Sequence, residues 1–153
     1  MIAASVKSGV GALSAILDHI QSLESYAERS GATLVRSALP EAVHGRLSRD
    51  HITLRFDLSP EQHLLALVHE LTHWLAHRDE GPRTPLARCT IYEYEAEAVE
   101  ALVMARLGLE VPLRGPGRAD GDGPTDGLLS SSVGRVISTT QRICQALGLE
   151  HCA

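Results

Sequence analysis

The chain has 153 residues, of which 44% are hydrophobic and 22% are charged, and its formal net charge is −5. These values fit one globular domain spanning residues 1–153 and exclude a membrane protein, because no apolar run approaches the length of a membrane span. The 14 Lys and Arg residues are scattered, which excludes a general nucleic-acid binder, because such a protein needs a clustered basic face.

The first third of the sequence predicts a helix followed by three short strands. Apolar residues recur at helical spacing over residues 10–29, and Gly31 follows as a helix stop. The opening run MIAASVKSGVGALSAIL lacks the basic start and unbroken apolar core of a secretory signal, so we expect a cytoplasmic protein. The runs ATLVRS, VHGRLS and HITLRFD then predict a small antiparallel sheet.

The third of these runs is expected to be a half-covered strand. Ile52, Leu54 and Phe56 alternate with polar residues and should face the core together. Its polar edge would accept an extended peptide by strand addition.

The rest of the chain is predicted to be helical, with one long loop. Ser59-Pro60-Glu61-Gln62 has the residues of a capping box, so a helix should begin near Pro60 and end near residues 78–80. Further helices are expected over residues 90–107 and 128–147, and the Gly- and Pro-rich run 111–127 between them is expected to be a mobile loop. The fold class is therefore α+β, with a small sheet packed on a central helix and on further helices.

The central helix carries the sequence His69-Glu70-Leu71-Thr72-His73. A match to His-Glu-x-x-His arises by chance in about 3 of 100 sequences of this composition, so its context matters. At about 100° per residue, His69, Glu70 and His73 share one helix face. The opposite face is an apolar stripe made of Leu64, Leu67, Val68, Leu71 and Leu75. Two imidazoles four residues apart can reach one zinc ion, which predicts a metal site.

A catalytic zinc needs a third protein ligand, and other histidines are poor candidates. His77 extends the row by one turn, but three ligands in line on one helix cannot surround an ion tetrahedrally. His63 faces away from His73. An exposed position, or one that orients a ligand from outside, is the expected role of either residue.

Carboxylates on the next helix are better candidates. Glu93, Glu97 and Glu100 share one face of this otherwise apolar helix, whereas Glu95 points nearly opposite. Aligned carboxylates on such a helix are costly unless solvated or coordinated, so either a solvated acidic stripe or a metal ligand is indicated.

The motif HELTH, followed by EYEAE, resembles the gluzincin pattern. More closely, DLSPEQHLLALVHELTHWLAH and YEYEAEAVEALVMARLGL are similar to the ImmA/IrrE family of small bacterial metallopeptidases and to the metallopeptidase domain of ArdC-type antirestriction proteins. The resemblance implies a zincin-like domain that holds one Zn²⁺ per chain. It implies that His69, His73 and Glu93 bind the metal, that Glu70 is the catalytic base, and that Glu97 orients a ligating histidine from outside.

The leading functional hypothesis is a zinc-dependent endopeptidase that hydrolyses a peptide bond in a protein partner. By resemblance, this partner is a transcriptional repressor or another regulator. Tyr92, Tyr94 and Arg55 are candidates to assist the oxyanion, but the favoured roles are helix packing for the tyrosines and a solvated strand position for the arginine. We expect no direct nucleic-acid partner, because the chain lacks the DNA-binding domain that many family members carry. In a separate departure from the family pattern, Glu100 stands where a small residue is usual.

Two alternatives remain open from the sequence. One is a non-proteolytic interaction protein of a mobile element, with an antirestriction or toxin-neutralising role, in which zinc only braces the fold. The other is a different zinc hydrolase, such as a deformylase or an amidase. A deformylase-like site would need a cysteine ligand upstream of the motif, and no cysteine precedes His69.

Overall fold

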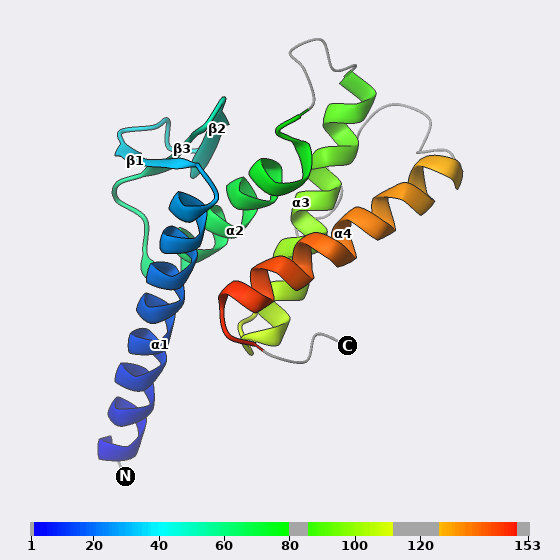
Figure 1. The fold of residues 1–153 in the computed structure, drawn as a ribbon. Coiled ribbons are helices and arrows are strands. Elements are labelled where there is room, and N and C mark those ends of the chain that lie inside the picture. The colour runs from blue at the N-terminus through cyan, green and yellow to red at the C-terminus, as the bar shows by residue number, and fades with distance from the viewer. Residues whose placement is uncertain (1, 80–85, 112–125, 150–153) are drawn as a thin grey trace. The chain divides into compact units, whose positions relative to one another are not determined.

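The computed structural model describes the backbone of residues 2–79, 86–111 and 126–149, and the side chains of residues 9–79, 90–111 and 131–149. This part of the chain forms four α-helices and a three-stranded sheet, which confirms the α+β class (Figure 1). The chain divides into two compact units, residues 1–67 and 68–153. The single domain expected over residues 1–153 stays a prediction.

The first unit begins with a helix longer than predicted. The first unit contains α1 (Ile2–Arg29), β1 (Thr33–Ser37), β2 (Gly45–Ser48), β3 (His51–Arg55) and the start of α2 (Pro60–His77). Gly31 ends α1 as expected, because its φ of 96° is in the left-handed region, where the amides of Gly31 and Ala32 bond back to Glu28 and Ala27. The buried face of α1 consists of Ile16, Ile20, Leu23 and Ala27.

The sheet is mixed, so the predicted antiparallel sheet is wrong. Its strand order is β1-β3-β2, with β1 parallel and β2 antiparallel to β3. The chain reverses between β1 and β2 and again between β2 and β3, so β1 and β3 run the same way. A sequential antiparallel sheet would require β1 to pair with β2, but β3 occupies the position between them.

The position and the end of β3 contradict two further expectations. Both edges of β3 are paired, so this strand cannot accept a substrate by strand addition. Ile52 and Leu54 are buried as predicted, whereas Phe56 is 64% exposed. The strand ends at Arg55, and the alternation that would have turned Phe56 inward stops there.

The start of α2 matches the capping prediction. The Gln62 amide donates to Ser59 Oγ at 3.2 Å, and the Ser59 amide donates to Gln62 Oε1 at 3.1 Å. One turn later His63 is buried and bonds Glu24 of α1, with Nε2 and Oε1 3.1 Å apart. His63 is therefore a packing residue of the first unit.

The second unit contains the rest of α2, α3 (Leu86–Arg106) and α4 (Asp126–Ala146). Helix α3 begins four residues before its predicted start and ends at Arg106, two residues before Gly108, whose φ is 70°. It packs against α4 (Figure 1). Residues 112–125 of the predicted mobile loop lie outside the described residues, and 126–127 belong to α4. Among the described helices, none has both the length and the apolarity of a membrane span.

Candidate metal centre

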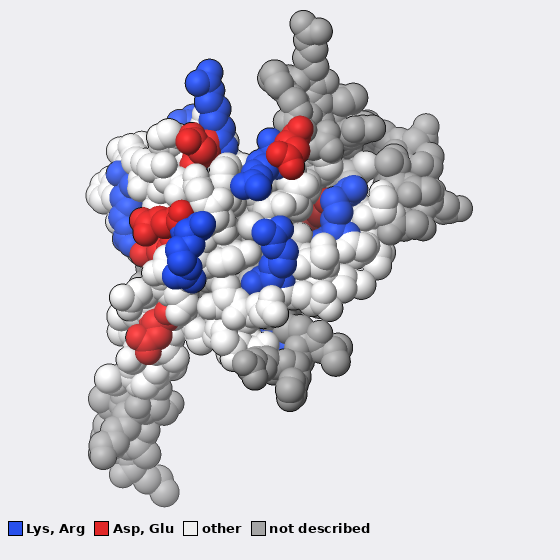
Figure 2. Space-filling model, in the orientation of Figure 1, with Lys and Arg blue, Asp and Glu red and all other residues white. Residues whose placement is uncertain are grey.

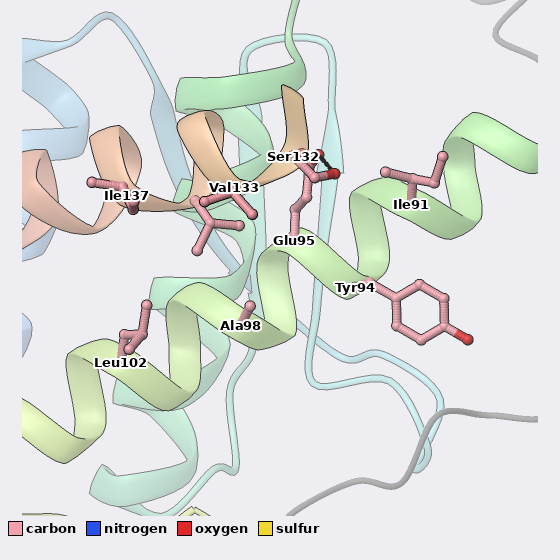
Figure 3. A pocket seen from close by; sticks show the side chains of 9 residues that line it. Ile91, Tyr94, Glu95, Ala98, Leu102, Ser132, Val133 and Ile137 are labelled. Carbon is pink, nitrogen blue, oxygen red and sulfur yellow. Dashed lines mark hydrogen bonds between the residues drawn. The ribbon is translucent and has the colours of Figure 1, made fainter. Parts of the chain in front are cut away.

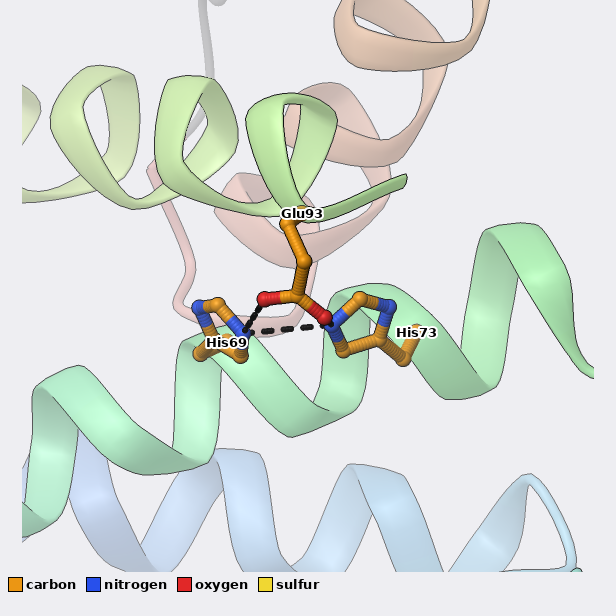
Figure 4. Close-up of side chains that lie close together, drawn as sticks. All are labelled: His69, His73 and Glu93. Atoms are coloured by element: carbon orange, nitrogen blue, oxygen red, sulfur yellow. Dashed lines mark hydrogen bonds and ion pairs between the residues drawn. The ribbon is translucent and has the colours of Figure 1, made fainter. Parts of the chain in front are cut away.

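Three predicted ligands meet in the second unit. His69 and His73 lie one turn apart on α2, and the Glu93 side chain descends from α3 between their rings (Figure 4). The two Nε2 atoms are 3.1 Å apart. Glu93 Oε2 lies 3.2 Å from His69 Nε2, and Oε1 lies 3.1 Å from His73 Nε2. The residues that the sequence placed on two separate helices therefore form one cluster.

The three side chains are close enough to share one metal ion. Glu93 meets the two Nε2 atoms with different oxygens, and one ligand atom from each of the three residues lies within 4.8 Å of the others. Two imidazoles and one carboxylate are also the donor set of catalytic zinc sites that keep a fourth position open. Glu93 is 59% exposed, so this side of the cluster faces solvent.

The outer nitrogen of His69 is held by a carboxylate that the resemblance did not select. His69 Nδ1 lies 2.7 Å from Glu100 Oε1, and the Glu100 side chain is 5% exposed. Within the described part of the chain, no hydrogen bond joins Glu97 to His69 or His73. Glu100 therefore occupies the place that was expected of Glu97.

The outer nitrogen of His73 bonds a third histidine. His73 Nδ1 and His77 Nδ1 are 3.0 Å apart, and His77 Nε2 lies 2.7 Å from Glu95 Oε2. His77 is buried and bonds the candidate ligand His73, so it does not stand in solvent. Glu95 does point away from the cluster, as the helical wheel indicated, but it reaches His73 through His77.

The charges around the cluster favour a cation. Burial acts to lower the pKa of His69, but hydrogen bonds to Glu100 and Glu93 and the nearby charge of Glu70 raise it to about 10. Hydrogen bonds from His69 and His73 hold the pKa of Glu93 well below its usual range. In the absence of a metal, a proton on His69 therefore balances part of the negative charge.

In the His77–Glu95 pair the pKa of the histidine is lowered, whereas that of His69 is raised. Burial lowers the pKa of His77, although the hydrogen bond to Glu95 opposes this effect. Burial acts to raise the pKa of Glu95, but hydrogen bonds from Arg135, Ser132 and His77 outweigh the effect of burial, so the pKa is lowered. The pair is thus a neutral imidazole beside a carboxylate.

The remaining predicted participants lie in different places. Glu70 is 7% exposed, and its charge acts on His69, as expected of a carboxylate beside the cluster. Tyr92 stacks on His77, with ring centroids 4.0 Å apart. Arg55 belongs to the first unit, where its Nε donates to Asp57. None of these contacts tests a role at the oxyanion.

A pocket lies between α3 and α4, and its lining is almost entirely apolar. It has a volume of about 480 Å³, and Ile91, Leu102, Val133 and Ile137 are among the residues that line it (Figure 3). Glu95 is the one carboxylate in its wall, and it is bonded to α4. On the face of the described chain in Figure 2, Lys and Arg side chains lie apart, separated by uncharged or acidic residues. Among the described residues, a group that could hold a metal ion is formed by His69, His73 and Glu93.

Comparison with known proteins gives no match: no family model, no curated protein and no solved structure matches this chain. The resemblance to the ImmA/IrrE family therefore depends on the motifs of α2 and α3 and on the cluster that they form.

Sequence reasoning missed that Glu95 and Glu100 bond the histidines of the candidate site. A signal for His77 was present, because it stands four residues after His73 on the same helix face. Glu100 shared the face of Glu93, but spacing alone did not distinguish it from Glu97. The partners of Glu95 on α4, Ser132 and Arg135, come more than 30 residues later in the sequence, so no local pattern could predict them.

Proposed function

We propose that this chain is a zinc-dependent endopeptidase that hydrolyses a peptide bond in a protein partner. The observation that carries the proposal is the convergence of His69 Nε2, His73 Nε2 and the Glu93 carboxylate, with Glu70 beside them in sequence. The motif and the cluster geometry both support the proposal. The resemblance to the ImmA/IrrE family adds a zincin-like arrangement and a regulator, such as a transcriptional repressor, as the substrate.

The residues of the cluster would divide the work as follows. His69, His73 and Glu93 hold the ion, and bound zinc supplies Lewis-acid chemistry, since it acidifies water and polarises a carbonyl oxygen. The Glu70 carboxylate takes a proton from the water that attacks the peptide carbonyl carbon. Glu70 then delivers this proton to the nitrogen of the leaving amine, so that one water is consumed and one peptide bond is broken.

The outer partners support this division. A histidine that binds metal through Nε2 carries its proton on Nδ1, where it needs an acceptor. Glu100 accepts at His69 and His77 accepts at His73. Each ligand therefore has a buried acceptor that favours the tautomer needed for metal binding.

The proposal is tested with Glu70→Gln, which keeps the size of the side chain and removes its basicity. The variant serves as bait for a partner in a pull-down, and the captured partner is then incubated with wild-type protein and zinc. We expect wild type to cleave it, and Glu70→Gln to bind equal zinc but to cleave about 10²- to 10⁴-fold more slowly. Glu97→Gln, a matched change on α3, should cleave at the wild-type rate.

The same experiment separates the non-proteolytic alternative. If the zinc only braces an interaction protein, the partner stays intact with wild type and zinc, and the biological effect survives Glu70→Gln. Full cleavage activity in Glu70→Gln would instead show that the chain is a peptidase but that Glu70 is not its general base.

A further inference from the structure

His73 is connected to α4 by a chain of three side chains. Its Nδ1 bonds His77 at 3.0 Å, and His77 bonds the Glu95 carboxylate at 2.7 Å. Arg135 Nη2 donates to Glu95 Oε1 at 2.7 Å, and Arg135 Nε lies 3.1 Å from both oxygens. Ser132, also on α4, donates to the same carboxylate (Figure 3). We call His77, Glu95 and Arg135 the relay.

The hydrogen bonds from His73 through His77 to Glu95 run in one direction, and Arg135 donates to Glu95 from the other side. An ionised Glu95 only accepts, so His77 carries a proton on Nε2. A neutral imidazole with a proton on Nε2 has an acceptor at Nδ1, and His73 must then donate from its own Nδ1. This bond leaves Nε2 of His73, which faces His69 and Glu93, as the nitrogen that would meet a metal ion.

Burial and stacking keep this chain in place. The His77 and Glu95 side chains are 6% and 3% exposed, so water competes little for their hydrogen bonds. Tyr92 lies nearly parallel to the His77 ring, with an interplanar angle of 18°. The ring plane of His77 is therefore fixed, and with it the direction of the acceptor that meets His73.

We propose that the relay positions the His73 ring as a metal ligand, with its Nε2 directed at His69 and Glu93. The proposal depends on the zinc site of the proposed function, and it assigns α4 a part in that site. The two histidine ligands are held differently: a carboxylate meets His69 directly, whereas a neutral imidazole stands between His73 and its carboxylate. This arrangement leaves one negative charge fewer in contact with the ligands than two direct carboxylates would.

The test compares zinc affinities by chelator competition. His77→Phe keeps an aromatic ring against Tyr92 but removes both nitrogens, and Glu95→Gln keeps size but removes charge. Each should weaken zinc binding by about 10- to 100-fold. Because the residues act in series, the double variant should lose little more than His77→Phe alone. Affinities equal to wild type in both single variants would overturn the relay.

Three further variants separate positioning from general damage. His63→Gln changes another buried histidine of α2 that bonds a glutamate, and Glu97→Gln changes an acidic residue of α3; both should bind zinc as wild type does. His77→Gln offers an amide oxygen to His73 and an amide hydrogen to Glu95, and should recover part of the affinity that His77→Phe loses. Absence of recovery would point to packing alone.

A metal-free measurement makes the outcome independent of folding in the variants. In wild-type protein with ¹⁵N-labelled histidine, we expect His77 to carry its proton on Nε2, with a scalar coupling between the facing Nδ1 atoms of His73 and His77. A proton on His77 Nδ1, or no coupling, would contradict the relay. If wild type shows the coupling but binds no zinc, the proposed function fails; if zinc binds equally to wild type and His77→Phe, the metal site stands and the relay is wrong.

Discussion

His69 Nδ1 and Glu100 Oε1 lie 2.7 Å apart, and this bond joins a predicted zinc ligand to a carboxylate that is almost completely buried. A buried carboxylate needs a partner that offsets the cost of its desolvation. The imidazole of His69 is such a partner, and in return Glu100 fixes the plane and the protonated nitrogen of the ring. The pair therefore belongs to the site as much as to the core.

Replacing Glu100 with Gln should weaken zinc binding while the protein stays folded. The amide retains the size of the side chain but loses the negative charge that strengthens the bond to His69, and the expected loss of affinity is about 10- to 100-fold. Chelator competition measures it. Glu97→Gln is the matched control and should bind zinc normally; a loss of affinity in Glu97→Gln and none in Glu100→Gln would return the orienting role to Glu97.

Replacing Glu93 with Ala should remove the metal. A zinc site with three protein ligands loses its carboxylate, and the two histidines that remain on one helix hold the ion weakly. Elemental analysis after dialysis should find about one zinc per chain in wild type and almost none in Glu93→Ala. Glu97→Ala, on the same helix, should retain the ion. Equal metal content in wild type and Glu93→Ala would show that Glu93 is not a ligand.

The sequence predicted the helices of the site well because their signals are local. The cap at Ser59 and the stop at Gly108 depend on a few neighbouring residues, and the apolar stripe of α2 follows from its own spacing. The same spacing brought His69 and His73 together and put Glu93 on a helix face with other carboxylates. Local periodicity was therefore sufficient to put His69 and His73 on one face and Glu93 among three aligned carboxylates, whereas the resemblance selected Glu93 as the expected ligand.

Features that depend on tertiary pairing were predicted less well. Alternation in β3 does not say whether its neighbours are β1 and β2 or β2 alone, so the mixed sheet was missed. The choice between Glu97 and Glu100 depends on how α3 is rotated against α2, which spacing fixes only within about 60°. Arg135 is more than 30 residues from Glu95, so its contribution became visible only in the structure.

Zinc affinity should rise steeply with pH in the alkaline range. The hydrogen bonds to Glu100 and Glu93 overcome burial and raise the pKa of His69 to about 10, so metal-free protein carries this proton at neutral pH. Zinc must displace it, and below this pKa each unit of pH costs about tenfold in affinity from this group. Competition titrations between about pH 7 and about pH 9 measure the slope. A pH-independent affinity would show that His69 is already neutral, and Glu100→Gln should flatten the slope by lowering the pKa of His69.

The stability of the metal-free protein should fall as the pH drops below about 6.5, in part because of His63. Burial and the nearby charge of Arg36 lower the pKa of His63, although Glu24 opposes the shift. The unfolded chain therefore takes up a proton at a higher pH than the folded protein does. Stability from this group is complete above the unfolded pKa and decreases below it by at most about 1.4 kcal/mol per unit of pH. Urea unfolding at about pH 7.5 and about pH 5.5 measures the change, which should be smaller in His63→Gln. His51→Gln, at an exposed histidine of β3, is the control, and an equal change in both variants would contradict the assignment to His63.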